Sequence, residues 1–402
     1  MNKPVRSRET GFAVAMVLVA IVILSVMGVG LLSLGLRGRV LAVRDALEIS
    51  ARCAADAGLT KAVFEMNERL KAKPWSDDID LPQAIGEVLP NCGATYSYTV
   101  TGDAGGGFTV EATGRAGSVE RTVRTTLPLQ GPFEYAIFTK ASVGLKNGGV
   151  VDWYNYDDDD ETFAVGTNTT KKDSIKLSNH ATIEGDIVVG YGGVPDVVVD
   201  LKKGATVTGE IYPLTGSYSL LPVTVPENLQ LMPSQGVLKG SEEINKSAKY
   251  DKIDLKKGET VTINGSVSLY VIGDVKLGNS AQLQVVDQAT NPNASLTLFL
   301  GGDFEGKKGS DINNRTKNAK KLKIYGLNSC EKIVFKNSSD FYGAICAPDA
   351  DVTFHNSANA FGAVVGQNFE QKNSAAFYYD ASLREVGVND EAVCFVVERW
   401  GE

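Results

Sequence analysis

The chain has 402 residues, a formal net charge of -8 at pH 7 and a pI of about 5.1. Its length allows two or three domains. Histidine occurs only twice and cysteine five times. Proteins that bind nucleic acid need a basic surface, and this acidic balance argues against one, so we expect no nucleic-acid partner.

An apolar segment without a charged residue runs over 11–36, after Lys3, Arg6 and Arg8. At about 1.5 Å per residue it is roughly 39 Å long as a helix, enough to cross the ~30 Å hydrocarbon core of a membrane with some tilt. A secretory signal peptide has a shorter apolar core of about 7 to 15 residues and a cleavage site behind it. Here a charged helical stretch follows, so we predict a transmembrane helix over 12–36. Basic residues flank both ends, and the positive-inside rule does not settle the orientation.

The junction in front of this helix, RETGFAV at 8–14, resembles the prepilin signal: a basic leader, then Gly-Phe, then an apolar helix. The resemblance implies a leader over 1–11, which a prepilin peptidase removes on the cytoplasmic face by cutting between Gly11 and Phe12. The N-terminus would be cytoplasmic, and the rest would be periplasmic or extracellular. Most major pilins carry Glu at the fifth mature position. Met16 stands there in this chain and favours a minor or tip-like subunit.

A helical pattern over 37–73 continues the membrane helix as an amphipathic stalk. Its apolar residues recur at spacings near three and four, and Pro74 ends the pattern. The stretch AADAGLTKA at 54–62 resembles PilX-type pilus assembly proteins. The expected apolar stripe comprises Leu41, Leu47, Cys53 or Ala54, Leu59, Val63, Met66 and Leu70.

The period of the pattern changes to two within 74–130. Short strands are predicted at 96–100, 108–112 and 119–125, separated by Gly-rich turns. A small antiparallel meander of this kind could cover the stripe of the stalk. It resembles the small sheet that follows the stalk in PilX-like proteins.

From about residue 131 the chain repeats itself. Gly185, Gly343 and Gly362 each stand six residues after an Asn, at Asn179, Asn337 and Asn356. The segment 201–207 is echoed at 255–261, an offset of 54 that would correspond to three coils of roughly 18 residues. Short strands with Asn and Gly at fixed corners are typical of a β-solenoid, in which stacked neighbours complete the core.

The predicted fold is therefore mainly β with an N-terminal membrane helix: a long pilin-like helix, a small antiparallel sheet and a β-solenoid (β-helix) over 131–385. A C-terminal strand or cap would follow over 386–402. A β-sandwich with coincidental internal similarity is the alternative, because the repeats are imperfect and 213–250 breaks the pattern. In a solenoid, Ile345 and Val364 would point inward on stacked coils, since both follow equivalent glycines.

Three segments of this part resemble PilX-type proteins that carry a polymer-forming, bactofilin-like β-helix. They are FEYAIF at 133–138, DWYNYD at 152–157 and FYGAICAPDA at 341–350. The resemblance is a pattern of strand and corner residues rather than a catalytic signature. It implies an architecture more strongly than an activity.

Right-handed β-helices also carry polysaccharide lyases and hydrolases with paired carboxylates. Asp349 and Asp351 would lie on one side of a strand, but we interpret them as a solvated outer face. His180 and His355 would occupy equivalent corner positions, and no nucleophile–base arrangement follows from their spacing. We therefore expect no enzyme activity.

The densest charge is the acidic run Asp157, Asp158, Asp159, Asp160 and Glu161. Its oxygens could hold Ca²⁺, but the run lacks the ordered spacing of a calcium loop, and a solvated acidic loop is the alternative. We expect no other cofactor. The aromatic residues just before it, Trp153, Tyr154 and Tyr156, could stack on sugar but are interpreted as an end cap of the solenoid.

The spacing between Cys330 and Cys346 is close to one predicted coil, so a disulfide between stacked strands is possible. Two unpaired core cysteines are the alternative in a reducing compartment. Cys53 and Cys92 could form a second pair and leave Cys394 over.

These observations predict a structural, single-pass membrane protein. It would be a minor pilin-like subunit, or a pilus or pseudopilus assembly protein, whose exported solenoid serves adhesion or capping. Its partners would be other pilin or pseudopilin subunits, prepilin peptidase, the membrane and a surface polysaccharide. A membrane-anchored adhesin outside any pilus is the second hypothesis, and a polysaccharide-active β-helix enzyme is the weakest.

Overall fold

The structure is a computed structural model that describes residues 10–76, 80–154, 162–216, 218–336, 340–355, 359–372 and 374–397. The chain divides into two compact units. The first contains the long helix up to Glu68 and the segment Ser76–Pro128. The second contains Leu129–Phe395 together with the short segment Arg69–Trp75. The prediction of a mainly β protein with one long N-terminal apolar helix is confirmed.

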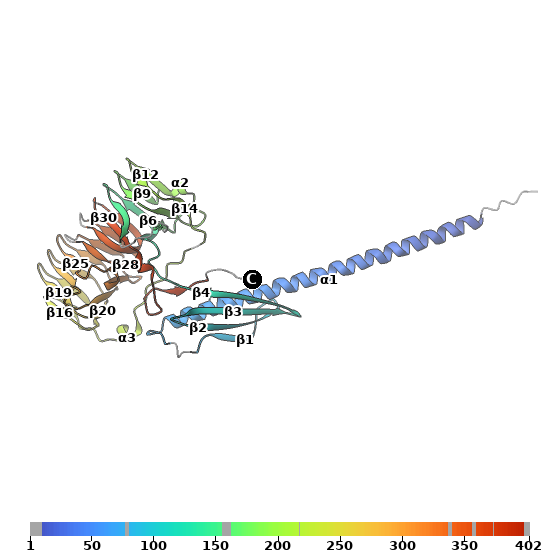
Figure 1. Ribbon diagram of the computed structural model, residues 1–402, viewed down its shortest axis with the longest axis horizontal. Coiled ribbons are helices and arrows are strands. Elements are labelled where there is room, and N and C mark those ends of the chain that lie inside the picture. The colour runs from blue at the N-terminus through green and yellow to red at the C-terminus, as the bar shows by residue number, and fades with distance from the viewer. Residues whose placement is uncertain are drawn as a thin grey trace, which may run out of the picture. The chain divides into compact units, whose positions relative to one another are not determined.

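Helix α1 (Thr10–Leu70) is continuous over 61 residues (Figure 1). No proline interrupts this stretch, so the apolar segment and the predicted stalk form one continuous helix. The aliphatic side chains between Val14 and Val43 are exposed. Among the described residues, α1 is the one helix long and apolar enough to cross a membrane, with a mean hydropathy of 2.9 in its most apolar window.

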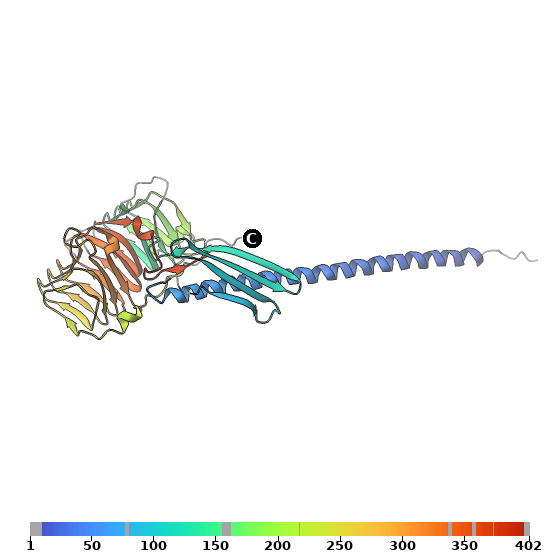
Figure 2. The ribbon, with the colours of Figure 1, turned by 60° about the horizontal axis from the view of Figure 1, so that its bottom comes forward.

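The C-terminal part of α1 packs against a four-stranded antiparallel sheet of its own unit (Figure 2). The strands are β1 (Gln83–Val88), β2 (Thr95–Asp103), β3 (Gly107–Ala116) and β4 (Val119–Leu127), in that spatial order. β2 to β4 extend the three predicted strands, whereas β1 was not predicted. Alternate β3 residues, among them Phe108, Val110 and Ala112, are buried.

Small residues allow the sheet to approach the helix closely. A Cβ atom on Gly114 would lie 2.0 Å from the Ala51 carbonyl oxygen, and one on Gly58 would lie 3.2 Å from the Tyr96 ring. This approach explains the Ala- and Gly-rich stretch at 54–62. Ala54, Leu59, Met66 and Leu70 are buried as expected, but Leu41 and Cys53 are exposed because the buried stripe does not extend that far or to that side.

The second unit consists mainly of short strands that pair in parallel, 21 of them in one sheet and four in another. Its short helices are α2 (Pro195–Val198), α3 (Glu227–Gln230), η1 (Ala319–Lys321) and η2 (Ala381–Arg384). The strands up to residue 213 are β5 (Leu129–Gln130), β6 (Ile137–Leu145), β7 (Val150–Tyr154), β8 (Ala164–Thr167), β9 (Ile175–Ser178), β10 (Thr182–Ile183), β11 (Asp186–Val189), β12 (Val199–Lys202), β13 (Thr206–Val207) and β14 (Ile211–Pro213).

The later strands are β15 (Val237–Leu238), β16 (Glu242–Ile244), β17 (Ala248–Tyr250), β18 (Lys252–Leu255), β19 (Thr260–Ile263), β20 (Ser266–Val271), β21 (Val275–Leu277), β22 (Gln282–Val285), β23 (Ser295–Leu300), β24 (Phe304–Gly306), β25 (Asp311–Asn314), β26 (Leu322–Gly326), β27 (Lys332–Phe335), β28 (Phe341–Phe354), β29 (Ala360–Gln371), β30 (Ala376–Asp380) and β31 (Cys394–Phe395). β31 pairs with β5 in a separate antiparallel ribbon.

The parallel strands form columns. The first column joins β15, β18, β21, β24, β27, β28, β29, β6, β9 and β12. The second joins β17, β20, β23, β26, β28, β29, β6, β8, β11 and β14. A third face has two parts, β16–β19–β22–β25 and β30–β7–β10–β13. The long strands β28 and β29 run through both of the first two columns and change register at 347–351 and 366–368.

Aliphatic residues in register build the core between the columns. In the second column Ile324 pairs with Ile345, Ile345 with Val364 and Val364 with Ile137, and all four are fully buried. The prediction that Ile345 and Val364 point inward is confirmed. Gly343 pairs with Gly362, and Gly185 likewise stands two residues before an inward residue of this column, Ile187. The three glycines are therefore equivalent.

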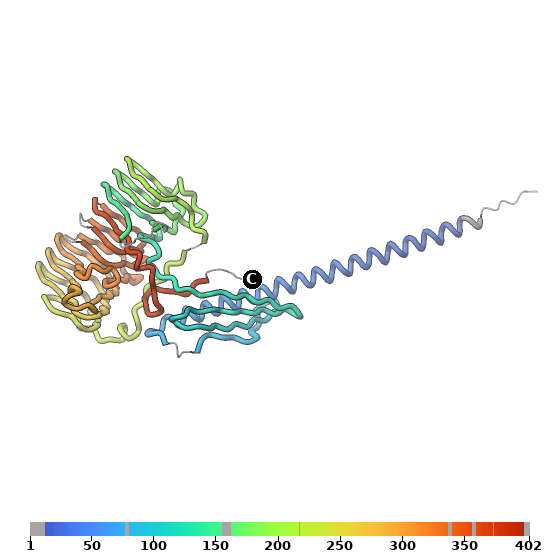
Figure 3. The backbone as a smooth tube through the Cα atoms, viewed as in Figure 1, coloured from blue at the N-terminus to red at the C-terminus, as the bar shows by residue number. Residues whose placement is uncertain are grey.

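The chain builds the stack in two passes that run in the same direction, with one jump back between them. Residues 137–213 form a first arm, and 237–380 form a second arm that returns from the far end. The last strands, β29 and β30, pair with the first, β6 and β7 (Figure 3). The green strands β12 and β14 and the yellow strands β16 and β19 therefore lie at opposite ends of the stack, and the red strands adjoin the teal β6.

The segment 214–236 links the two arms and explains why the repeat pattern breaks there. It packs on the outer face of the second column, where Phe138 is fully buried although it points away from the core. The Tyr218 ring lies 4.7 Å from the Phe138 ring and 5.3 Å from the Tyr135 ring. The Asn168 side-chain amide donates to the Tyr218 carbonyl over 2.8 Å.

The predicted period is too short for most of the stack. Paired positions differ by 19 in number at Gly343 and Gly362, by 22 at Val261 and Leu283, and by 24 at Ile187 and Ile211. The echo between 201–207 and 255–261 is not a period, since Leu201 and Leu255 occupy the same column near its opposite ends. Asn179 has the expected left-handed backbone, with φ of 55°. The other two predicted corner asparagines, Asn337 and Asn356, lie outside the described residues.

Candidate functional site

The predicted processing site, Gly11 and Phe12, lies at the start of α1. The backbone of Gly11 and Phe12 is helical, and the leader over 1–9 lies outside the described residues. Met16, at the position of the expected Glu, is 62% exposed on the apolar part of the helix. The cut between Gly11 and Phe12 stays a prediction.

The acidic run lies outside the described residues, so Asp157, Asp158, Asp159 and Asp160 have no structural account as a calcium site. Among the residues that the structure describes, no group of three or more His, Cys, Asp or Glu side chains could hold a metal ion.

Asp349 and Asp351 each make contacts on the outer face of β28. Lys140 contacts Asp349 at 2.6 Å, and the Asn368 amide donates to Asp351 over 2.7 Å. The histidines are not equivalent as expected, because the register through Phe354, Gln371, Leu145 and Leu177 places Ser178 opposite His355. Burial, with Lys372 and Lys336 nearby, lowers the pKa of His355.

The aromatic residues before the acidic run do not cap an end of the stack. Their strand β7 lies between β30 and β10, in the middle, because the last strands return there. The Trp153 ring contacts the Phe163 and Tyr379 rings at 5.0 and 5.7 Å, and the Arg384 guanidinium lies over it at 5.5 Å. The end-cap interpretation of Trp153 and Tyr154 is therefore wrong, and Tyr156 lies outside the described residues.

The structure contains five free cysteines and no Cys330–Cys346 disulfide. The two cysteines do not occupy matching positions on neighbouring levels, since Cys346 pairs with Tyr325. Burial raises the pKa of both Cys330 and Cys346 to about 12, so both thiols stay protonated near neutral pH. Cys53 and Cys92 are exposed and Cys394 is half-buried, and none of the three forms a disulfide.

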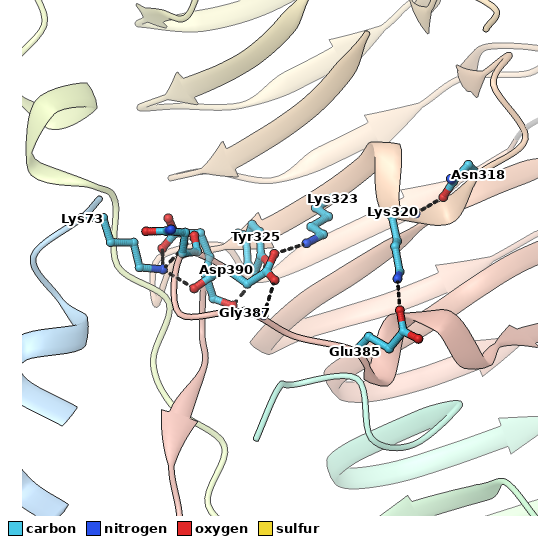
Figure 4. A network of polar contacts seen from close by, with 10 residues as sticks. Lys73, Asn318, Lys320, Lys323, Tyr325, Glu385, Gly387 and Asp390 are labelled. Carbon is cyan, nitrogen blue, oxygen red and sulfur yellow. Dashed lines mark hydrogen bonds and ion pairs between the residues drawn. The ribbon is translucent and has the colours of Figure 1, made fainter. Parts of the chain in front are cut away.

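A network of charged residues joins the end of the second unit to the short segment that follows α1 (Figure 4). The Lys73 ammonium lies 3.2 Å from the Glu391 carboxylate and donates to the Asp390 carbonyl. The Asp390 carboxylate contacts Lys323 at 2.6 Å and accepts from the Gly387 N–H over 2.9 Å. We call Lys73, Lys323, Asp390 and Glu391 the tail clamp.

Further contacts extend the clamp on both sides. The Trp75 N–H donates to the Asn389 side chain over 2.7 Å, and the Trp75 ring meets the Phe395 ring edge-on at 6.2 Å. Lys320 contacts Glu385 at 2.8 Å. The segment 73–75 is thus held to the same unit as the parallel stack by the tail at 385–395.

The charges of the clamp are partly removed from water. Burial lowers the pKa of Lys73 and raises the pKa of Glu391, and in each case the partner charge opposes the shift. Burial also acts to raise the pKa of Asp390, but Lys323, the Gly387 N–H and Lys73 outweigh it and hold that pKa below its ordinary value. Sequence spacing gave no signal for this site, because its lysines come from segments far from the acidic tail in the sequence.

Comparisons with known proteins cover parts of this architecture. A family model described as Domain of unknown function (DUF7305) matches residues 245–386, which is most of the second arm. No curated protein matches the chain. Among solved structures, the competence-associated pilin ComZ from Thermus thermophilus aligns with 88% of this chain and 97% of its own, at 14% identity and a TM-score of 0.26. So low a score does not establish a common fold, and the functional argument rests on the residues of this chain.

Proposed function

We propose that this chain is a minor pilin-like subunit, or a pilus or pseudopilus assembly protein, that presents a β-solenoid outside the cell. The observation that carries the proposal is the division of α1. Its aliphatic first part is exposed and apolar enough to span a membrane, while its last turns lie under an antiparallel sheet. A helix exposed on all sides with aliphatic residues needs lipid or neighbouring subunits around it.

The prepilin-like junction gives the proposed orientation. A cut between Gly11 and Phe12 on the cytoplasmic face would place the sheet β1–β4 and the second unit in the periplasm or outside the cell. The small-residue stripe under Gly114 supports a pilin-like stalk, because it keeps the sheet against the helix rather than leaving the helix free.

We infer that the parallel stack is a β-solenoid. Parallel pairing along its columns, with inward aliphatic residues in register, supports this reading over a sandwich, whose sheets are antiparallel. The second unit would act in adhesion or capping without catalysis. The contacts of Asp349 with Lys140 and of Asp351 with Asn368 favour a structural role for both carboxylates.

Mass spectrometry of the mature N-terminus tests the pilin-like assignment. We expect a chain that begins at Phe12 in wild type and keeps its leader in Gly11→Val. The matched control is Gly28→Val, since a Cβ atom on Gly28 meets nothing within 4 Å. An intact leader in wild type, or a cut behind the helix, would contradict the proposal.

Immunogold labelling of sheared filaments tests the minor role. Sparse or terminal label is expected, and dense uniform label would contradict it. Absence from filaments, with label over the whole cell surface, would favour the anchored adhesin. Met16→Glu should be tolerated or raise incorporation if a neighbour's N-terminus can pair with it, despite a cost of about 2.5 to 3.5 kcal/mol for an unpaired acid at mid-membrane.

A further inference from the structure

One edge of the stack carries a file of lysines. The strands of the first column are parallel, so their C-terminal ends meet along this edge, one level about every 4.8 Å. Each turn of the chain contributes one strand to this column, and we call such a turn a level. On most levels a lysine follows the last residue of the strand that points into the core. These lysines are Lys146, Lys202, Lys256, Lys307, Lys336 and Lys372. The next position adds Lys203, Lys257 and Lys308. We call these residues the lysine edge.

The lysine edge is only partly neutralised. Acidic residues on the same or a neighbouring strand pair with five of its members: Asp200 with Lys202, Asp254 with Lys256, Glu305 with Lys336, and Glu370 with both Lys146 and Lys372, at 2.5 to 3.7 Å. Within the described part of the chain, Lys203, Lys257, Lys307 and Lys308 form no ion pair, and all four are exposed. The positive charges of these four lysines are therefore not neutralised by an ion pair.

Two of the four unpaired lysines, Lys257 and Lys307, line a cleft. Gly278 occupies the level between Lys256 and Lys307, and a Cβ atom there would lie 2.8 Å from the Lys256 carbonyl carbon. Beside Gly278 lies a cleft of about 450 Å³, whose charged lining comprises Lys256, Lys257, Lys276 and Lys307 with the acidic Asp254 and Glu305. This volume lies within the range of small-molecule and sugar-sized sites.

We propose that the lysine edge binds a linear anionic polysaccharide, with the Gly278 cleft as its main subsite. A single file of ammonium groups fits a thin polymer that carries a carboxylate on each sugar ring. The Asn279 amide lies at the cleft and can bind hydroxyl groups, whereas the Asn147 amide donates to the Lys372 carbonyl and accepts from the Asn179 amide. Single-stranded nucleic acid is bound through aromatic stacking as well as charge, and no described residue of this file is Phe, Tyr or Trp.

This inference deepens the adhesive role proposed above and rests on the stack being outside the cell. Its test does not depend on that location. Binding of the full chain in nanodiscs to polygalacturonate is measured at low ionic strength, with dextran as a neutral probe and oligo-dT as a nucleic-acid probe. The variant is Lys257→Glu with Lys307→Glu. The matched control is Lys246→Glu with Lys317→Glu, two exposed lysines away from this edge with the same change of charge.

We expect wild type to bind polygalacturonate and not dextran, with an affinity that falls as salt rises. The Lys257→Glu and Lys307→Glu variant should lose about tenfold or more in affinity, and the control should stay within about twofold. No binding by wild type, equal losses in both variants, or preference for oligo-dT would each overturn the proposal. None of these outcomes bears on N-terminal processing, which tests the pilin-like assignment separately.

Discussion

The two ends of the stack are covered differently. At the end of the first arm Leu201 is 42% exposed, although it stacks on Leu177, which is 1% exposed. At the opposite end of the stack, where the second arm begins, Leu238 and Ile244 are 2% and 7% exposed, although their strands also have a neighbour on one side only. Near that end the connection 214–236 adds the buried Val223 and Leu229 to the core.

The difference shows that one level of the stack cannot bury its inward apolar side chains by itself. An inward residue is protected only where another level or a covering segment lies on it, which is the expected behaviour of a stacked repeat. The same substitution should therefore have different costs at equivalent positions of the two arms.

The largest expected effect is that of Ile345→Asp. Ile345 is fully buried between Ile324 and Val364, and an unpaired carboxylate there should cost at least about 3 kcal/mol. The matched change at the open end, Leu201→Asp, should cost under about 1 kcal/mol. Urea unfolding of the full chain, followed by tryptophan fluorescence, gives both values. Equal losses would mean that the end of the first arm is covered.

A smaller effect is expected at the contact between β28 and β29, the last two long strands of the second arm. Gly362 has φ of 146°, and a Cβ atom on it would lie 1.9 Å from the Gly343 carbonyl oxygen. Gly362→Ala should therefore cost about 1 to 3 kcal/mol through overpacking. Gly216→Ala in the connection, where nothing lies within 4 Å, serves as the control and should leave the unfolding midpoint unchanged. A stable Gly362→Ala protein would contradict the register between β28 and β29.

The contribution of the tail clamp to the free energy of unfolding should depend on pH. The pKa of Asp390 is lowered in the folded chain, so its contribution is present above its unfolded pKa and is lost as pH falls through the folded pKa. Asp390→Asn should cost about 1 kcal/mol at neutral pH and less in acid. Glu391 acts in the opposite direction, because its raised pKa favours proton uptake by the folded state. A difference between wild type and variant that does not shrink in acid would contradict the role of the Lys323 pair.

The last prediction concerns reactivity rather than stability. Thiol labelling should distinguish the exposed cysteines from the buried ones. Exposed Cys53 and Cys92 should react with iodoacetamide before Cys330 and Cys346, whose burial raises their pKa to about 12. Peptide mapping after timed labelling of the native chain measures the order. Non-reducing mapping of protein from its own compartment shows whether Cys330 and Cys346 are ever joined.

Much of the architecture could be predicted because it depends on local patterns. The uncharged run at 11–36 and the small residues at 54–62 specify a long helix with two different surroundings. The glycines at 185, 343 and 362 mark equivalent positions on different levels. Their spacing from the preceding Asn could be recognised because a single corner sets it.

The return of the second arm could not be predicted, because nothing in the sequence of β29 states that its neighbour is β6. The wrong interpretation of Trp153 and Tyr154 as an end cap has the same cause. It assumes that strands early in the sequence of the second unit lie at an end of the stack. The lysine edge was also missed. A net charge of -8 suggested no basic surface, but residues such as Lys203 and Lys257 come into line only when the register is known.

The pairing of first and last strands sets a waiting time during synthesis. After Tyr154 has emerged, one edge of β7 stays unpaired until Ala376 and the rest of β30 have been made. At about 5 to 20 residues per second this takes about 10 to 45 seconds. During that interval the unpaired edge of β7 is exposed to pairing with a wrong strand.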